Sequence, residues 1–156
     1  MFAYPKYRYT ARVIRQVIQA DYEGARTTRI LAHALSFNPY EMPTTFQPYP
    51  HTPSIYVKNA AKAGNANRLL KVVIRFRFLG NWLQLGKRLF DQVLREGGVW
   101  HLYGHSWEID RLGLWPALGE LLDYVAGREG VLYVTNYQMV SLLRAESYMP
   151  SSEQEI

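Results

Sequence analysis

The sequence predicts an α/β fold with a mostly parallel sheet. Short segments rich in β-branched and aromatic residues alternate along the chain with segments whose apolar residues have helical spacing. Because parallel strands need crossover connections, and helices usually supply them, this order favours a parallel sheet. The 156 residues suit one core, so we expect a single α/β domain over residues 1–150 and a frayed tail over residues 151–156.

Composition narrows the class of protein. Hydrophobic residues make up 48% of the chain and charged residues 20%, as in a folded globular protein. No apolar run approaches the roughly 20 residues of a membrane span, and the first residues lack the order of a signal peptide, so the default expectation is a cytoplasmic protein without a membrane partner. The absence of cysteine excludes disulfides and thiolate metal sites.

The net charge of +5 raises the possibility of an acidic polymer as partner. The basic residues are only loosely clustered between Lys58 and Arg95, and no block of five consecutive charges occurs. A solvated basic face is therefore favoured over nucleic-acid binding.

The first 28 residues predict a strand, a helix and a second strand. The opening FAYP is a short strand that Pro5 ends, and Thr10 suits the N-cap of the helix. The helix ends between Ala20 and Gly24, and EGARTT then favours extended backbone because of its paired threonines. The apolar residues that share one face of the helix are Val13, Ile14, Val17 and Ile18.

Residues 33–67 are rich in proline and show no clean period, which predicts a long ordered loop. Its aromatic residues argue against disorder, and they either form a binding rim or pack onto the core. These residues are Phe37, Tyr40, Phe46, Tyr49 and Tyr56.

The second half of the chain continues the alternation. Residues 68–79 fit a strand or a helix, and periodicity does not separate the two. Asn81 suits the N-cap of a helix with Leu85, Leu89 and Val93 on its buried face. The predicted elements are a helix over 82–96, a strand over 99–103, a helix over 115–128, a strand over 131–135 and a helix over 137–145.

The segment HLYGHSWEID, from His101 to Asp110, concentrates the chemistry. Gly104 breaks the preceding strand, so His105 lies at a strand end, where sites collect in α/β folds. His105 suits general acid or base work because an imidazole changes charge near neutral pH, and the alternative is a structural histidine bonded to a loop. Trp107 suits stacking on a sugar ring or forming a pocket wall.

Metal binding by this segment alone is disfavoured. His101 and His105 are four residues apart, which separates them by about 13 Å on a continuous strand, too far to share one ion with Glu108 or Asp110. Arg26, on the second strand, suits contact with a carboxylate or an acidic substrate, or a structural ion pair.

The order of these motifs resembles the polysaccharide deacetylase superfamily. The matching segments are residues 2–28, residues 101–110 and LYVTN at 132–136. The resemblance implies a partial, distorted (β/α) barrel and a metal-dependent hydrolase that removes acetyl groups from amino sugars. The resemblance carries over one role only: His105 resembles the late histidine that protonates the leaving amine or steadies the tetrahedral intermediate, with His101 as the competing choice. Apart from the resemblance, we expect Tyr4, Arg26, Trp107 and Glu108 to bind substrate.

Departures from the family pattern limit what the resemblance implies. The TFDDG-type segment and the His-x-x-x-His element, which supply the family's base and its Asp, His and His metal ligands, do not occur in this sequence. Phe2, Ala3 and Tyr4 stand where the family often has an arginine before proline, and HTPS at His51 lacks the second histidine of a ligand pair. We therefore expect the carboxy-terminal half of such a protein, with no zinc-like divalent metal bound by this chain alone.

Two functions follow. The first is deacetylation of a glycan, incomplete as an enzyme in this chain, and the second is a non-catalytic carbohydrate-binding or assembly module. An opened barrel would expose strand edges, so we also expect self-association or a partner that covers them.

Overall fold

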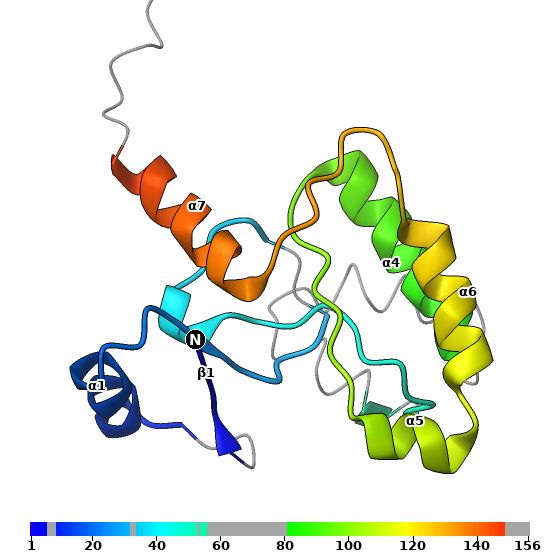
Figure 1. Cartoon of the computed structure of the whole chain (residues 1–156), viewed down its shortest axis with the longest axis horizontal. Coiled ribbons are helices and arrows are strands. Elements are labelled where there is room, and N and C mark those ends of the chain that lie inside the picture. The colour runs from blue at the N-terminus through cyan, green and yellow to red at the C-terminus, as the bar shows by residue number, and fades with distance from the viewer. Residues whose placement is uncertain (6–8, 32–33, 53, 56–80, 149–156) are drawn as a thin grey trace, which may run out of the picture. The chain divides into compact units, whose positions relative to one another are not determined.

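The structure is a computed structural model that describes residues 1–5, 9–31, 34–52, 54–55 and 81–148 (Figure 1). The described chain is mostly helical. Two compact units are present: the first contains residues 1–27, 36–42 and 132–156, and the second contains residues 28–35 and 43–131. The elements are β1 (Phe2–Ala3), α1 (Ala11–Gln19), β2 (Ala25–Arg26), η2 (Pro39–Glu41), α4 (Trp82–Glu96), α5 (Ser106–Leu112), α6 (Trp115–Val125) and α7 (Asn136–Tyr148).

The first unit contains the predicted strand, helix and strand. β1 and β2 are parallel, with Phe2 opposite Ala25 and Ala3 opposite Arg26. α1 begins after Thr10, whose side chain accepts a hydrogen bond from the backbone N–H of Val13 at 3.3 Å, as the N-cap prediction requires. The expected strand, helix and strand over residues 2–28 are confirmed.

α7 and η2 approach the start of β2 closely within the first unit. A Cβ on Gly24 would lie 2.8 Å from the Pro39 carbonyl oxygen and 2.9 Å from Val140 Cγ2, so only glycine fits. Arg144 donates from Nη2 to the carbonyl oxygen of Glu23 at 2.8 Å, and its Nη1 lies 3.3 Å from the Glu23 carboxylate. These contacts fix the helix against the turn before β2.

The prediction of a partial, distorted (β/α) barrel is wrong. In the described residues the only sheet is the two-stranded β1–β2 pair, and elsewhere parallel pairing is limited to two isolated bridges, Arg26 with Met42 and Phe46 with Leu102. The segments 99–103 and 131–135, which we expected to be strands, are not strands. A barrel needs successive backbone hydrogen bonds along each strand.

Proline gives one physical reason for the short ladders. The chain on either side of the two bridges contains Pro39, Pro43, Pro48 and Pro50, none of which has a backbone N–H to donate. Pairing at Met42 and at Phe46 therefore does not extend into a strand. Self-association, which we expected from the open edges of the barrel, stays a prediction.

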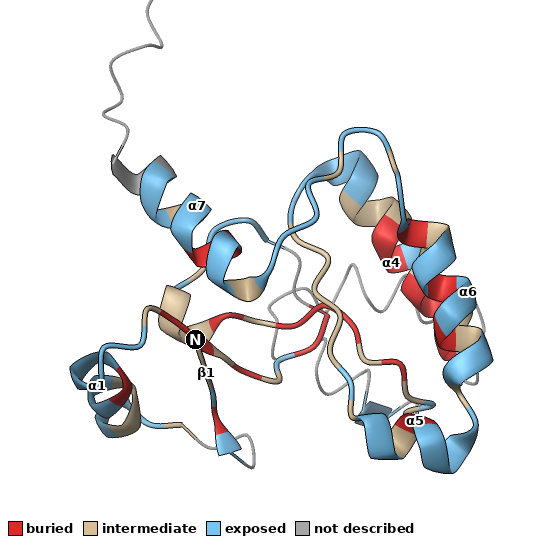
Figure 2. Ribbon diagram, in the orientation of Figure 1, coloured by how far each residue is buried: buried red, intermediate tan, exposed pale blue. Residues whose placement is uncertain are grey.

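The core of the second unit lies largely between α4 and α6 (Figure 2), whose facing sides carry buried residues. α4 has the predicted bounds, and the Asn81 side chain caps it by accepting from the Gln84 backbone N–H at 3.2 Å. The buried residues of this core are Ile30, Leu31, Phe46, Trp82, Leu85, Leu89, Phe90, Ile109, Leu118, Leu121 and Val125. None of the described helices is long and apolar enough to cross a membrane.

Phe46 shows that at least one aromatic residue of the proline-rich loop packs onto the core and does not form a binding rim. It is 1% exposed and stacks between Trp82 and Trp100, at ring-centroid distances of 6.1 and 6.3 Å, so this aromatic packs into the core. Phe37, Tyr40 and Tyr49 are half-buried. Tyr56 and the ambiguous segment 68–79 lie outside the described residues.

Two helical glycines offer a matched test of the α4 and α6 packing. A Cβ on Gly86 would lie 2.9 Å from Cε1 of the buried Phe46 ring and 3.1 Å from Leu121 Cδ2, whereas a Cβ on Gly119 would have no neighbour within 4 Å. We expect Gly86→Ala to lower the free energy of unfolding by about 1–3 kcal/mol because the core is overpacked. Gly119→Ala should raise it by about 0.5–1 kcal/mol through helix propensity alone.

Urea unfolding of both variants, followed by circular dichroism, measures these changes. An increase in stability for Gly86→Ala similar to that for Gly119→Ala would contradict the close packing of Phe46 against α4.

Candidate functional site

The candidate site in the second unit is built where an extended segment passes into α5. Tyr103 donates its backbone N–H to the Phe46 carbonyl oxygen at 3.0 Å, and Phe46 donates to the His101 carbonyl oxygen at 3.1 Å, so the two segments lie side by side. A Cβ on Gly104 would lie 3.1 Å from Pro48 Cγ. His105 follows as the N-cap residue of α5, with extended backbone.

Three aromatic side chains, Tyr103, His105 and Trp107, form what we call the His105 cluster. The Tyr103 hydroxyl and the His105 Nε2 are hydrogen-bonded to each other. The imidazole also stacks on the Trp107 indole, with ring centroids 4.0 Å apart and an angle of 26° between planes. Trp107 is 62% exposed, so a ligand can reach the indole surface that the imidazole leaves uncovered.

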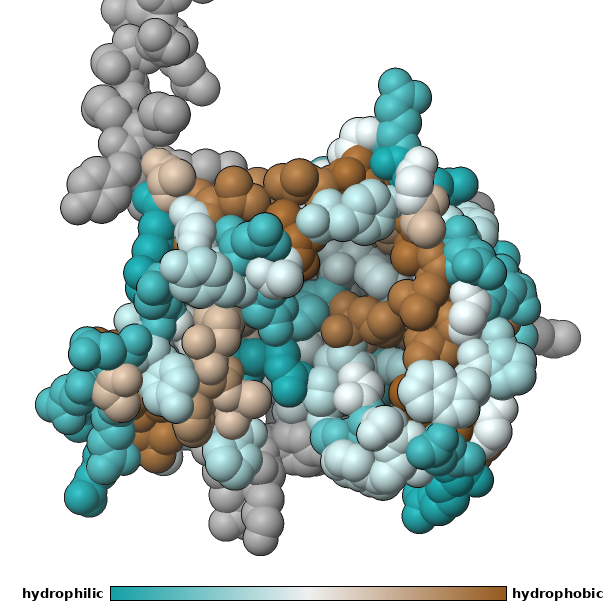
Figure 3. Space-filling view, viewed as in Figure 1, coloured by the Kyte–Doolittle hydropathy of each residue, from teal (hydrophilic) through white to brown (hydrophobic). Residues whose placement is uncertain are grey.

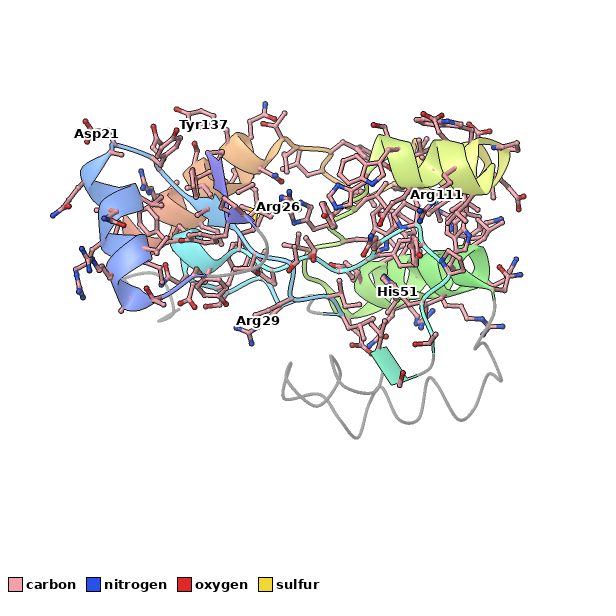
Figure 4. The ribbon with its side chains drawn as sticks, turned by 90° about the horizontal axis from the view of Figure 1, so that it is seen from below. Asp21, Arg26, Arg29, His51, Arg111 and Tyr137 are labelled. Atoms are coloured by element: carbon pink, nitrogen blue, oxygen red, sulfur yellow. The ribbon has the colours of Figure 1, made fainter. Side chains whose placement is uncertain are left out.

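Two hydrogen bonds also connect His51 to Gln47, and Gln47 to Glu108, the residue after Trp107 on α5. The His51 Nε2 lies 2.9 Å from the Gln47 Oε1, and because an amide oxygen only accepts, the imidazole N–H donates. Gln47 in turn donates from Nε2 to the Glu108 carboxylate at 3.1 Å. Gln47 thus ties Glu108, and with it the first turn of α5, to the loop that carries His51. His51 is labelled in Figure 4.

Burial and charge act in opposite directions on His51. Burial lowers the pKa of His51 below its ordinary value, and the nearby Glu108 carboxylate opposes that change by favouring the charged form. The net direction is downward, so the folded protein favours the neutral imidazole.

His101 has a different environment from His105. Its Nδ1 lies 2.9 Å from the Pro43 carbonyl oxygen, to which it donates, and its backbone N–H donates to the Thr45 hydroxyl at 3.0 Å. Thr45 donates its own backbone N–H to the His101 carbonyl oxygen at 2.9 Å. These bonds are those of a histidine that holds two backbone segments together, and they favour His105 over His101 as the chemical group.

Tyr4 and Arg26 belong to the first unit, whereas the other four predicted site residues belong to the second. Tyr4 is 5% exposed, stacks on Tyr9 and donates its hydroxyl to the Tyr40 carbonyl oxygen at 2.8 Å. Burial, and to a smaller extent the Glu41 carboxylate, raises the pKa of Tyr4. Tyr4 is therefore a core residue of that unit, and Arg26 is half-buried beside it on β2.

The histidine and carboxylate side chains of the described residues do not gather into a metal site. Within the part of the chain that the structure describes, no group of three or more histidine and carboxylate side chains could hold a metal ion. The described residues do not fit the zinc-like metal that the family resemblance implies.

Sequence reasoning missed α5 and the contacts that depend on it. No helix was expected between residues 103 and 115, but residues 106–112 are helical, which places Glu108 and Asp110 on a helix. Two ordinary sequence signals could have identified this helix: Glu108 in its first turn and Gly113 directly after its last residue. Gly113 ends the helix in left-handed conformation, with φ 62°. Nothing in the sequence indicated the contact between Gln47 and Glu108, which joins residues 61 positions apart.

Comparisons with models of protein families, with characterised proteins and with solved structures found no match to this chain.

The lowered pKa of His51 predicts a pH-dependent contribution to stability. Its unfolded value is 6.5, so below that pH the unfolded chain binds more protons than the folded one, and stability falls as pH is lowered towards the folded pKa. Replacing His51 by glutamine removes the titrating group. The free energy of unfolding of the native protein, compared with that of His51→Gln, should therefore decrease as pH falls below 6.5.

Urea unfolding of both proteins across this pH range measures the difference. A difference that stays constant with pH would show that His51 does not titrate differently in the two states.

Proposed function

We propose that this chain is a polysaccharide deacetylase-like protein for the hydrolysis of N-acetyl carbon–nitrogen bonds on a glycan, incomplete as an enzyme in this chain, with His105 as the proton donor. One observation carries the proposal: His105 stacks on an indole that is 62% exposed, while its Nε2 is hydrogen-bonded to Tyr103. The motif that contains these residues, HLYGHSWEID, is also the segment that resembles the deacetylase family.

The arrangement suits a sugar substrate. Indole faces pack well against apolar surfaces, and the carbon-bound hydrogens of a pyranose ring provide such a surface. A sugar ring on the part of the Trp107 indole that the imidazole leaves uncovered would lie next to His105, which stacks on the same side chain. Stacking and the Tyr103 hydrogen bond restrict the imidazole, which lowers the entropic cost of placing it against a reacting group.

The proposed role of His105 is limited to one proton. In amide hydrolysis, water adds its oxygen to the acetyl carbon and releases a proton to solvent, the carbon–nitrogen bond breaks, and acetate leaves while the nitrogen takes up a proton. The group that protonates the nitrogen then recovers a proton from solvent. An amine leaves far more readily once its nitrogen is protonated, and an imidazole can supply that proton near neutral pH. His105 would donate to the glucosamine-type nitrogen as the bond breaks.

Binding of a glycan without hydrolysis is the second candidate. It is favoured by the lack of a metal-ligating group among the residues that the structure describes, because water activation in the family depends on a metal. It uses the same exposed Trp107 and requires no chemistry at His105.

An acetate-release assay on the full chain tests the first candidate. Oligomers of N-acetylglucosamine are incubated with the protein, with and without added Zn²⁺, and acetate is quantified. We expect slow acetate release, because the family's metal-binding segments do not occur in this sequence, and we expect His105→Asn to reduce its rate roughly 10²- to 10⁴-fold, the usual contribution of a general acid. Tryptophan fluorescence titration with the same oligomers should show little change in affinity for this variant.

Two further variants separate the candidates. Trp107→Ala should weaken oligomer binding, whereas Leu122→Ala, at an exposed apolar position on α6, serves as a control and should not. Saturable, Trp107-dependent binding without acetate release would replace hydrolysis by the binding function. No binding and no release would overturn both.

A further inference from the structure

A second exposed tryptophan lies next to the His105 cluster. Trp115, the first residue of α6, is 50% exposed and donates its indole N–H to the Asp110 carboxylate at 2.5 Å. Asp110 is exposed on α5, three residues after Trp107, and residues at this spacing share one face of a helix. Trp107, Asp110 and Trp115 therefore form one continuous area, which we call the two-tryptophan surface.

The exposure of these two indoles is not required by the core. α6 buries Leu118, Leu121 and Val125 against the rest of the second unit, and Trp115 is not part of that set. By contrast, Trp82 is 7% exposed. Exposed tryptophans placed together are typical of binding surfaces, where the large ring contributes much of the affinity.

The polar groups around the indoles favour a carbohydrate over an apolar partner. Ser106 and Asp110 are exposed on α5 itself. In Figure 3 the surface over α5 is mostly pale, the shade of residues of intermediate hydropathy, with hydrophilic side chains beside it. Stacking rings interspersed with hydrogen-bonding groups match a sugar, which has an apolar ring face and a polar edge.

The carboxylate between the rings adds a charge preference. Asp110 accepts from Trp115 through Oδ1, and no bond to its Oδ2 is present among the described residues. A carboxylate in this position attracts a cation, and the amine that remains on a deacetylated amino sugar is protonated near neutral pH.

We propose that the two-tryptophan surface is a second sugar subsite, in which Trp115 stacks on a neighbouring residue of the glycan and Asp110 favours a residue whose amine is free. The subsite is continuous with the first because Trp107 belongs to both. The inference rests on the proposed function and names its substrate class: a glycan that carries free amines as well as acetylated ones.

Titration with two oligomers of equal length tests the subsite. One is fully acetylated and the other consists of glucosamine with free amines, and binding to the full chain is followed by fluorescence or by NMR shifts of the indole N–H groups. Asp110→Asn should weaken binding of the amine oligomer about two- to fivefold and leave binding of the acetylated oligomer unchanged, as expected for one exposed ion pair. Asp123 is an exposed carboxylate on α6, eight residues or about 12 Å along the helix from Trp115. Asp123→Asn is the matched control and should change the affinity for neither oligomer.

Trp115 is tested with two substitutions. Trp115→Ala should weaken the binding of both oligomers about tenfold through loss of stacking. Trp115→Phe keeps an aromatic ring and should retain most of the affinity. Circular dichroism verifies that each variant is folded, and Trp115→Phe keeps the test informative if the alanine variant is not.

The outcomes separate this inference from the proposed function. If Trp107→Ala lowers the affinity for the oligomers and Trp115→Ala does not, the second subsite alone is overturned. If Asp110→Asn binds the oligomer with free amines as tightly as the native protein does, the charge preference is overturned. Loss of affinity in Trp115→Ala without any His105-dependent acetate release would support the subsite and overturn hydrolysis.

Discussion

The burial of Phe46 against α4 is the constraint on which the second unit depends. Its ring occupies the space that Gly86 leaves on the helix, and it stacks between Trp82 and Trp100. The same residue joins the backbone of the 43–46 segment to that of 101–103 through the bridge with Leu102. Side-chain packing and backbone pairing at one position thus fix where the chain enters α5, and so where the candidate site lies.

The tryptophans show how one residue type takes two roles. Trp82 and Trp100 pack against Phe46, and the Trp100 Nε1 is buried with no hydrogen-bond partner among the described residues, so its value to the fold is its apolar surface. Trp107 and Trp115 are 62% and 50% exposed, and their contacts are made along the surface: Trp107 stacks on His105, and Trp115 donates to Asp110. Exposure, rather than residue type, separates the structural tryptophans from those proposed to bind sugar.

The fold does not follow the family resemblance, because no barrel is formed in the described residues. The resemblance rests on short motifs and leads to the proposed role of His105, which stays a proposal. The barrel that it implied is not formed, because pairing at Met42 and at Phe46 stops after single bridges in a proline-rich stretch. The surroundings of His105, including its stack on Trp107, come from α5 and need no barrel.

The sequence by itself determined the local elements: Thr10 and Asn81 mark the starts of α1 and α4, and apolar spacing defines their buried faces. These signals are local, since caps and helical periodicity act within a few residues. Only the tertiary structure decided which extended segments pair, that Phe46 is core, and that Gln47 bonds Glu108. Such contacts join residues far apart in the chain, and their free energies depend on packing that no local pattern encodes.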